Sequence, residues 1–425
     1  MRISTRRVVV AAGLVLGFAS TALAEPEYDF YKIDSFNANP LAGETFVWDV
    51  NDAGVVVGEA TMDNRIGYPG FKWTVETGKI EIPVTGLKGI SNTGFTAGLA
   101  NIHNYETNQT WSPSALPGTY YSPRFGDIND AGLAVGTISG CSCSDSGGVT
   151  YVPYLWDQVN GAHSMPFPIP NAKGLSRINN NGVALGWLNG FVAGGWFFTD
   201  LNTGAYTLLA DVVPPTLGVG VVGAADINDN GDVLCGRAGT FPVYRYSFIY
   251  SPDGNIHLLP FPGAGYQQQV SASGINNSRT VVGSITNEFA TQFAFVYNEA
   301  TGLRNLNNPA IVANIPAGYT MRSAMKVSNS GWIIGNGTQG NKNTGWSLKP
   351  RGVVCNSIDF NNDGSFFDPQ DIDAFLSVYS EGPCVPDTAT CDDIDFNNDT
   401  SVFDPCDIDS FLLMYSEGPC APCGG

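Results

Sequence analysis

The sequence predicts an all-β fold: a seven-bladed β-propeller closed by its N-terminal strand and followed by a small α-helical calcium-loop module. Three observations predict the propeller. A motif of the type Ile-Asn-Asp-x-Gly-x-Val-Val-Gly occurs seven times, its copies begin 38 to 52 residues apart, and most copies precede an aromatic strand pattern, a glycine and an aliphatic strand pattern. A period of roughly 40–50 residues, with turn formers and β-branched residues in each unit, is typical of four-stranded blades.

The first element is a predicted signal peptide over residues 1–24. It combines three arginines within residues 1–7, an apolar core over residues 8–19 and the small-x-small site Ala22-Leu23-Ala24 before Glu25. This core is too short to span a bilayer, and no later stretch approaches the about 20 apolar residues of a transmembrane helix. We therefore expect a secreted, extracellular protein without a transmembrane segment; a periplasmic or cell-surface location stays open.

Composition divides the mature chain into residues 25–354 and 355–425. The first part holds 17 Lys and Arg against 24 Asp and Glu, whereas the second holds 15 Asp and Glu and neither Lys nor Arg. Most of the net charge of −19 therefore lies in the second part. Such a segment repels nucleic acid and anionic lipid and attracts cations, so we expect no nucleic-acid partner.

Each of the seven units in residues 25–354 is predicted to form two β-hairpins. A strand ends at the Ile or Val, Asn-Asp-x-Gly forms the turn, and an apolar run ending in Gly forms the next strand, because these turn residues accept positive φ. The aromatic strands that follow are expected to fill the space between blades. The seven copies begin at Val50, Ile90, Ile128, Ile178, Ile227, Ile275 and Val327.

The two ends of this region complement each other. Residues 30–36 resemble the fourth strand of a unit, whereas the seventh unit ends after residues 345–348 without a fourth strand. We expect the N-terminal strand to complete the last blade, which leaves no open edge in the ring. The second unit is the irregular one, because a second hairpin is hard to find between Gly98 and Ile128.

On these motifs the repeats resemble those of bacterial extracellular HAF-repeat proteins, in which an Ile-Asn-Asp-x-Gly-x-Val-Val-Gly core precedes an Ala-Phe-x-Trp strand. The resemblance covers almost all of residues 25–351. It implies an exported repeat domain and assigns no activity, because a fold does not by itself supply a function.

The acidic segment contains two loops, 36 residues apart, that are typical of calcium binding. Side-chain oxygens at loop positions 1, 3 and 5 and a backbone carbonyl at position 7 match an EF-hand loop, and an acidic helix start follows each loop. The pair is similar to a dockerin module over residues 356–415, which implies Ca²⁺ as the bound ion. The candidate metal ligands are Asp359, Asn361, Asp363, Ser365, Asp368 and Asp371 in the first loop, and Asp395, Asn397, Asp399, Ser401, Asp404 and Asp407 in the second.

Both loops depart from the dockerin pattern. The last carboxylate of a dockerin-type loop lies at position 12, whereas Asp371 and Asp407 fall at position 13 and Asp368 and Asp404 at position 10. Which of the two closes each loop stays open. In the second loop Thr400 replaces the glycine that eases the sharp turn. The alternative interpretation is an acidic linker rich in Asx turns that holds no ion.

Six of the nine cysteines lie in the acidic segment, which in an exported protein indicates disulfides. Cys355 and Cys384 flank the first loop-helix unit, and Cys391 and Cys420 flank the second at the same offset of 36 residues. A Cys₄ zinc site is disfavoured, because residues 420–423 are the only C-x₂-C. Cys235, in an apolar strand, is interpreted as a small core residue. The predicted pairs are Cys355–Cys384 and Cys391–Cys420, with Cys406 and Cys423 left to pair together or stay free.

The propeller region offers few catalytic candidates. The three histidines, His103, His163 and His257, fall in different units, and no nucleophile elbow or HExxH motif is present. The carboxylate pairs Glu44 with Asp49 and Asp226 with Asp229 suit glycosidase chemistry in principle. These acids sit in or beside the repeated turns, which favours a structural role. Residues 226–232 also faintly resemble a calcium loop, but they align with six ordinary turns.

Two classes of function remain. The first is a secreted, non-catalytic binding or scaffold protein, expected to be a monomer, whose partner is a cohesin-like protein or a polysaccharide. The second is a polysaccharide-degrading enzyme, a glycoside hydrolase or lyase, tethered through the dockerin-like tail. Residues Tyr105, Trp111, Tyr120 and Tyr121 form a group suited to stacking on sugar rings; the alternative is that they cover an irregular second blade.

Overall fold

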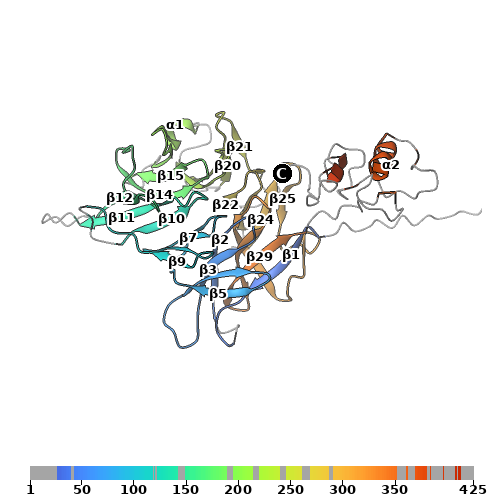
Figure 1. The fold of residues 1–425 in the computed structure, drawn as a ribbon, viewed down its shortest axis with the longest axis horizontal. Helices are drawn as coiled ribbons and strands as arrows, with labels where there is room; N and C mark the ends of the chain where they lie inside the picture. Colours follow the sequence, from blue (N-terminus) through green and yellow to red (C-terminus); the bar gives the residue numbers. More distant parts are fainter. Residues whose placement is uncertain are drawn as a thin grey trace, which may run out of the picture.

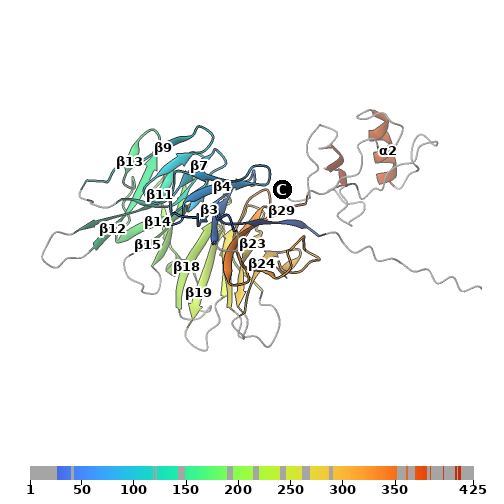
Figure 2. The same ribbon diagram turned by 90° about the horizontal axis from the view of Figure 1, so that it is seen from below.

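The structure is a computed structural model. It describes residues 26–39, 43–117, 119, 122–141, 149–188, 195–213, 220–239, 246–260, 269–286, 291–351, 360–361, 369–380, 383, 396, 407–408 and 410–412. The described strands form seven sheets, one for each copy of the motif, which are antiparallel apart from one parallel strand pair at the edge of the seventh. This confirms the predicted seven-bladed propeller (Figures 1 and 2).

Six blades have four strands in chain order, and the seventh also takes up the N-terminal strand. Blade 1 contains β2 (Thr45–Val50), β3 (Val56–Ala60), β4 (Gly70–Thr74) and β5 (Gly78–Ile82). Blade 2 contains β6 (Gly89–Ile90), β7 (Phe95–Ala97), β8 (Ile102–Asn104) and β9 (Gln109–Trp111). Blade 3 contains β10 (Arg124–Ile128), β11 (Ala134–Cys141), β12 (Val149–Asp157) and β13 (Gly161–His163). Blade 4 contains β14 (Ala172–Ile178), β15 (Val183–Leu188), β16 (Trp196–Asp200) and β17 (Tyr206–Leu208), followed by the short helix α1 (Leu209–Val212).

The remaining blades follow the same order. Blade 5 contains β18 (Gly220–Ile227), β19 (Val233–Gly239), β20 (Tyr246–Tyr250) and β21 (Ile256–Leu258). Blade 6 contains β22 (Gln269–Ile275), β23 (Val281–Thr286), β24 (Gln292–Asn298) and β25 (Gly302–Asn305). Blade 7 contains β27 (Tyr319–Val327), β28 (Ile333–Gln339), β29 (Lys342–Pro350), β1 (Tyr28–Ile33) and β26 (Val312–Ala313).

The repeated motif forms the turn between the first two strands of each blade, as predicted. In blade 1 the Asn51 side-chain oxygen accepts a hydrogen bond of 2.9 Å from the Val55 amide. Gly54, at the fourth position of the turn, has φ +75°, a conformation that glycine adopts without steric cost. The turn therefore depends on the Asn and Gly of the motif.

The N-terminal strand closes the ring, as predicted. β1 pairs antiparallel with β29 from Tyr28 opposite Pro350 to Ile33 opposite Gly345. Ion pairs reinforce this junction: Arg351 contacts Asp29 at 2.9 Å and Arg304 contacts Glu27. The strand begins two residues earlier than expected and ends at Ile33 rather than Phe36.

The aromatic strands fill the space between blades, also as predicted. A fully buried aromatic ring lies in the third strand of six blades, where burial of one ring stabilises by about 2–3 kcal/mol. Phe71 of blade 1, for example, belongs to a cluster that includes Ile334 of blade 7. The six rings are Phe71, Tyr154, Phe197, Phe248, Phe295 and Trp346.

Blade 2 is truncated, which agrees with its weak sequence pattern. Its strands have only two or three residues each. Trp111 in β9 packs on Phe95 of the same blade and on Trp156 of blade 3, with ring centroids 5.8 and 5.5 Å apart. Short strands in this blade are therefore compensated by aromatic packing against its neighbour.

The described part of the acidic segment has a small core of its own. Helix α2 (Pro369–Tyr379) follows the first predicted calcium loop. Phe375 of α2 stacks on Phe411, with centroids 4.2 Å apart, and both pack with Phe360 and Phe396. These phenylalanines come in pairs 36 residues apart, so equivalent positions of the two sequence copies contribute to one core.

Candidate functional site

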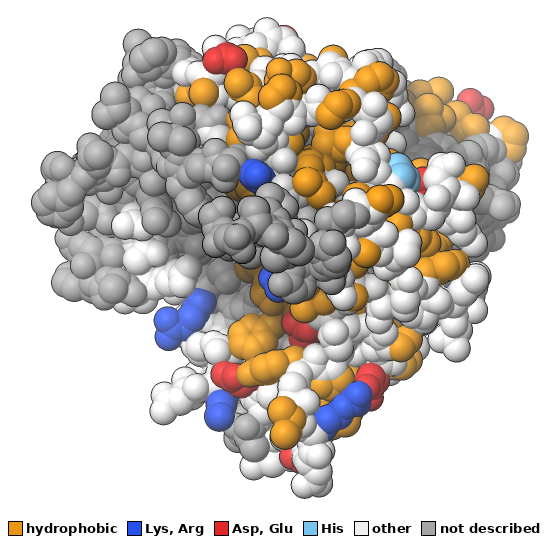
Figure 3. Space-filling model, turned by 90° about the vertical axis from the view of Figure 1, so that its left-hand side faces the viewer, with side chains coloured by type: hydrophobic (Ala, Val, Ile, Leu, Met, Phe, Trp, Pro, Cys, Tyr) orange, Lys and Arg blue, Asp and Glu red, His pale blue; other side chains and the backbone are white. Residues whose placement is uncertain are grey.

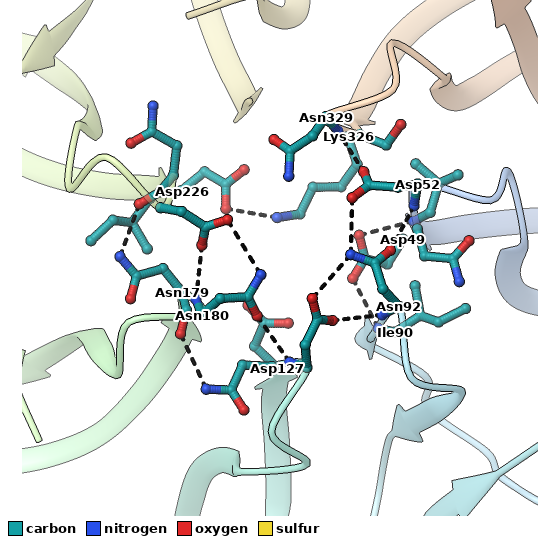
Figure 4. A pocket seen from close by; sticks show the side chains of 18 of the residues that line it. Asp49, Asp52, Ile90, Asn92, Asp127, Asn179, Asn180, Asp226, Lys326 and Asn329 are labelled. Carbon is teal, nitrogen blue, oxygen red and sulfur yellow. Dashed lines mark hydrogen bonds and ion pairs between the residues drawn. The ribbon is translucent and has the colours of Figure 1, made fainter. Parts of the chain in front are cut away.

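The candidate site is a cavity of about 120 Å³ at the propeller axis, at the end where the repeated turns meet. Seven blades contribute to its wall (Figure 4). The wall is mostly polar, because the Asn and Asp of the motif and four of the residues that precede its Ile or Val line it: Asp49, Asp127, Asp226 and Lys326. The residues at this preceding, axial position are, in chain order, Asp49, Gly89, Asp127, Arg177, Asp226, Gly274 and Lys326.

A β-bulge directs these side chains inward. The pairing between the first two strands slips by one residue just before the axial position in six blades, for example between Val47 and Asp49. A bulge bends the strand and turns the next side chain. Side chains along β2 alternate between buried and half-buried up to Trp48, and the bulge then turns Asp49 toward the axis.

The three axial aspartates join neighbouring blades. In Asp49, Oδ1 accepts a bond from its own blade, Val50 N at 2.9 Å, and Oδ2 accepts one from Ile90 N of blade 2 at 3.0 Å. Asp127 makes the same two bonds, to the amides of Ile128 and Ile178. Asp49 therefore connects blade 1 to blade 2, and Asp127 connects blade 3 to blade 4.

Asp226 makes the equivalent inter-blade bond and also holds the two axial cations. Its Oδ2 accepts a bond from Ile275 N at 3.1 Å, and its Oδ1 lies 2.6 Å from Lys326 Nζ. Arg177 Nε lies 3.6 Å from the same Oδ1, while its Nη1 donates to the carbonyls of Gly126 and Ser176. Five blades thus meet in one buried charged cluster.

Burial dominates the protonation of this cluster. The pKa of Asp49 is raised to about 7, chiefly by burial and to a smaller extent by Asp127, against the opposing effects of Lys326, the Ile90 amide and Arg177. Burial likewise raises the pKa of Asp127, although Lys326 and Arg177 oppose the change. Burial lowers the pKa of Lys326, but the attraction of Asp226, with smaller contributions from Asp49 and Asp127, outweighs it and leaves the pKa raised.

A closed ring of seven hydrogen bonds surrounds the mouth of the cavity. The backbone amide of the third motif residue in each blade donates to the side-chain Oδ1 of the same residue in the next blade, at 2.6 to 3.0 Å. The bond from Asn329 to Asp52 closes the circle between blades 7 and 1. The ring members are Asp52, Asn92, Asp130, Asn180, Asp229, Asn277 and Asn329.

A second set of bonds uses the preceding Asn. In five blades its Nδ2 donates to a backbone carbonyl of the next blade, as Asn129 does to Asn179 at 3.2 Å. Blades 2 and 7 have Ser91 and Ser328 here, which are too short to reach. Their inter-blade bonds come from Thr93 and Ser330, two residues later, which donate to the Asp130 and Asp52 carbonyls.

Two carboxylate pairs were considered for catalysis. The structure separates Glu44 from Asp49, and it uses Asp226 and Asp229 in hydrogen bonds between blades. Glu44 precedes β2 and Asp49 lies near its end, so about 17 Å of strand separates them. Asp226 and Asp229 both line the cavity, but Asp229 accepts from the amide of Asn180 and the side chain of Asn277. Both carboxylates therefore serve blade closure.

The three histidines lie away from the cavity, in outer strands of three blades. His103 is buried in β8, where Nδ1 contacts Thr110 Oγ1 at 3.0 Å, and burial lowers its pKa. His163 and His257 lie in the fourth strands β13 and β21. None of them can take part in chemistry at the axis.

The calcium-like stretch at residues 226–232 has another role. Asp232 is fully buried and accepts two bonds from Arg279 of blade 6, at 2.8 and 2.9 Å. Arg279 takes the place of the turn glycine and has φ +56°. The carboxylate that would complete a calcium loop is thus committed to an ion pair between blades.

Sequence reasoning did not single out Arg177 and Lys326. The available signal was their position: in all seven copies the residue directly before the motif's Ile or Val is charged or glycine. Cys235 is buried and free, as interpreted from the sequence. Among the residues described by the structure, no three His, Cys, Asp or Glu side chains are grouped as a metal site requires.

Several predictions fall outside the described residues. These are the signal peptide, all the predicted disulfide cysteines, Tyr120, Tyr121 and nine of the twelve calcium ligands; Asn361, Asp371 and Asp407 are the described ones. None of the described helices has the length and apolarity needed to cross a membrane.

Comparison with family models and with characterised proteins gives no match. Among solved structures, the chain is similar to an oligogalacturonate lyase in complex with manganese, with a TM-score of 0.50 and 10% identity over 77% of this chain and 98% of that one. It also matches an acylaminoacyl peptidase, with a TM-score of 0.46 and 11% identity over 72% of this chain and 51% of the peptidase. At this identity the likeness to the lyase shows the propeller fold alone.

Proposed function

We propose that the protein is a secreted, non-catalytic binding or scaffold protein, in which a propeller of HAF-type repeats is displayed with a Ca²⁺-binding, dockerin-like tail. The observation that carries the proposal is the state of the axial carboxylates. Both oxygens of Asp49, Asp127 and Asp226 accept hydrogen bonds: one oxygen of each accepts from the next blade, and the other accepts from the following amide of its own blade or from Lys326. A general acid or base must reach a substrate proton, and these groups are already engaged.

Surface side chains supply the binding role. Several large apolar residues are strongly exposed, and Figure 3 shows apolar side chains over much of one described face, with charged groups scattered among them. Exposed apolar surface of this kind suits a protein or polysaccharide partner. The exposed residues include Ile66, Tyr68, Ile80, Leu99, Tyr151, Val159, Phe167, Tyr206 and Leu258.

The aromatic group at blade 2 contributes less to this role than its sequence suggests. Trp111 is engaged with Phe95 and Trp156. The Tyr105 hydroxyl accepts a bond from Asn51 at 3.0 Å, and Lys72 lies 4.7 Å from the centroid of its ring. These contacts favour covering the truncated blade over stacking on sugars.

Two described residues of the first loop support the Ca²⁺ assignment. Asn361 and Asp371, at loop positions 3 and 13, are both buried. Asp371 Oδ1 accepts a bond of 2.9 Å from the amide of Phe360, the second loop residue, so this carboxylate reaches the loop. The contact favours position 13 as the residue that closes the loop. Asp407, its counterpart in the second loop, is also buried.

A binding assay and an activity assay on the full chain test the proposal together. We expect retention on a polysaccharide or a cohesin-like protein and no release of reducing ends or unsaturated sugars from mixed polysaccharides. Oligogalacturonate with Mn²⁺ belongs in the panel because of the lyase neighbour. Turnover that Asp49→Asn abolishes would replace this proposal with the tethered-enzyme alternative.

Calorimetry with Ca²⁺ tests the tail. We expect binding in the low-millimolar range or tighter, with one site lost in Asp371→Ala and the other in Asp407→Ala. Asp373→Ala is the matched control, because this residue lies two positions after Asp371 on α2 and is outside the predicted ligand set. Unchanged Ca²⁺ binding in both variants would contradict the assignment.

A further inference from the structure

The charged side chains of the propeller are separated between its two ends. At the end with the repeated turns, three aspartates belong to the ring, and the turns between the third and fourth strands add further acids. Among the turns at this end, all of which the structure describes, Arg279 is the only Lys or Arg, and it pairs with Asp232. The further acids, in or directly beside the turns, are Glu76, Glu106, Asp157, Asp200, Asp253 and Glu299.

Positive charges gather at the opposite end, where the first strand of each blade begins. Arg124 is the first residue of β10, Lys173 is the second residue of β14, and Lys88 directly precedes β6. Arg322 in β27 is a fourth cation at this end. Of the described residues at these strand starts, one is an acid, Glu44 in blade 1.

The three cations of blades 2 to 4 form a continuous arc, because the first strands of these blades contact one another. A Cβ atom added to Gly89 would lie 2.9 Å from the Cα of the axial aspartate of β10, so β6 and β10 touch next to Lys88. Thr137 pairs with Arg124 in the sheet, and its hydroxyl donates to the Lys173 carbonyl at 2.7 Å. Lys88, Arg124 and Lys173 are called the cationic arc below.

The arc keeps its charge available to a ligand. Within the described part of the chain, no carboxylate forms an ion pair with any of its three members. Arg124 is exposed, and Lys88 and Lys173 are half-buried. Glu59 lies near Lys88, but it accepts hydrogen bonds from Trp48 Nε1 at 3.3 Å and from the amide of Gly86.

Arg177 extends from the axis toward the same end. Its Nη1 donates to the carbonyls of Gly126 and Ser176, which precede the axial position, and its side chain stays 26% exposed without lining the cavity at the repeated turns. Burial lowers the pKa of Lys88, Glu59 opposes that change, and the positive charge of Arg177 adds to it. Arg177 therefore lies behind the arc and strengthens its field.

Two tryptophans accompany the arc. Lys88 Nζ lies 3.4 Å from the centroid of the Trp48 ring, which is half-buried. Trp187, also half-buried, packs against Gly174, where an added Cβ would lie 2.3 Å from its Cη2, and Gly174 directly follows Lys173. Partly exposed aromatic rings beside cations suit sugar rings that carry carboxylate groups.

We propose that the cationic arc binds the carboxylate groups of an acidic polysaccharide at the end of the propeller opposite to the repeated turns. This inference rests on the proposed binding role and names the chemistry of the ligand. The acids at the other end repel the same polymer. The chain leaves the propeller at Arg351, at the end with the repeated turns, so the ligand and the start of the acidic segment lie at opposite ends.

Binding of the full chain to polygalacturonate, measured by calorimetry, tests the proposal. EDTA is included so that Ca²⁺ cannot bridge the polymer and the acidic tail. Because exposed ion pairs are individually weak and screened by salt, we expect binding that requires a polymer and weakens as the salt concentration rises. The fully methyl-esterified polymer, which has no carboxylate, should not bind.

Variants locate the site. Lys173→Gln should weaken binding about threefold and the double variant Arg124→Gln/Lys173→Gln about tenfold. Lys349→Gln is the matched control, because it removes an exposed lysine at the end with the repeated turns, and it should bind like the wild type. Lys173→Arg keeps the charge and should also bind normally, which separates loss of charge from loss of fold.

Three results would overturn the inference. Equal losses in Lys173→Gln and Lys349→Gln would show that binding follows net charge alone. Tighter binding of polyglutamate than of polygalacturonate would replace the polysaccharide with an acidic protein. Equal binding of the charged and the esterified polymer would remove the arc's role and leave the proposed binding function standing, whereas a chain that binds no polysaccharide and no cohesin-like protein would remove both.

Discussion

Replacing Arg279 by glycine should destabilise the propeller, although glycine is what the other six turns have at this position. Arg279 donates through Nε and Nη2 to both oxygens of Asp232, and Nη2 also contacts Ser251 Oγ at 3.0 Å. Asp232 is fully buried where other copies have Val55 or Val183. The two unusual residues of neighbouring copies therefore compensate each other.

The size of the effect follows from two opposing contributions. Glycine removes the strain of an L-residue at φ +56°, which is about 1 kcal/mol. Removing one partner of a buried ion pair costs about 3–5 kcal/mol. The cost is smaller here, because the Arg279 side chain is 38% exposed and because Ser251 and Asn228 still donate to Asp232. The loss of the ion pair is therefore expected to cost about 2–3 kcal/mol. Arg279→Gly should thus cost about 1–2 kcal/mol, and Arg279→Ala about 1 kcal/mol more, because alanine keeps the strain.

The assay is chemical denaturation followed by tryptophan fluorescence, as a double-mutant cycle with Asp232→Val. The double variant restores the usual motif in both copies and should lie within about 1 kcal/mol of the wild type. Burial raises the pKa of Asp232, but the bonds from Arg279, Asn228 and Ser251 outweigh it and hold that pKa below its usual value. The pair's contribution is therefore lost as the pH falls, and the gap between wild type and Arg279→Gly should narrow in acid. If Arg279→Gly is as stable as the wild type, or the two substitutions are additive, the reasoning is refuted.

Three further predictions concern other parts of the ring. Trp111→Ala should cost about 2–4 kcal/mol in a denaturation curve, because its ring packs on Trp156, and should leave polysaccharide retention unchanged; lost retention with unchanged stability would reverse this assignment. Asn129→Ala removes both the turn bond and the bond to the Asn179 carbonyl and should cost about 2 kcal/mol, whereas a cost near zero would contradict its inter-blade role. Cys235, buried and with its pKa raised by burial, should resist alkylation in the native protein and react after unfolding, as mass spectrometry would report; rapid native labelling would show that the core of blade 5 opens.

Local patterns in the sequence were sufficient to predict the blades and their closure. Three features depend on neighbours in the chain or on a simple count of strands. They are the turn at Gly54, the aromatic strand at Phe71 and the missing fourth strand of the last unit. The weak pattern between Gly98 and Ile128 correctly indicated a truncated blade. The axial site was not predictable in this way, because the pairing of Lys326 with Asp226 joins residues 100 positions apart.

At the third position of the motif, comparing the copies explains part of the choice between Asp and Asn, and the arrangement of the ring explains the rest. Asn replaces Asp in four of the seven copies, which indicates that the position does not require an acid, and in the structure both residue types take part in the ring of hydrogen bonds between blades. In space, however, Asp and Asn alternate: each Asn amide can donate to a neighbouring Asp, as Asn92 does to Asp52 at 2.9 Å and to Asp130 at 3.0 Å.

Two adjacent aspartates would repel each other in this ring, and the alternation avoids that arrangement. A ring with an odd number of members cannot alternate completely, so one like pair must remain. In this ring that pair is Asn277 beside Asn329, both neutral, next to the junction that the N-terminal strand closes. The order of Asp and Asn along the chain therefore leaves no two aspartates side by side in the ring, and this includes the pair of Asn329 and Asp52 that closes the circle between blades 7 and 1.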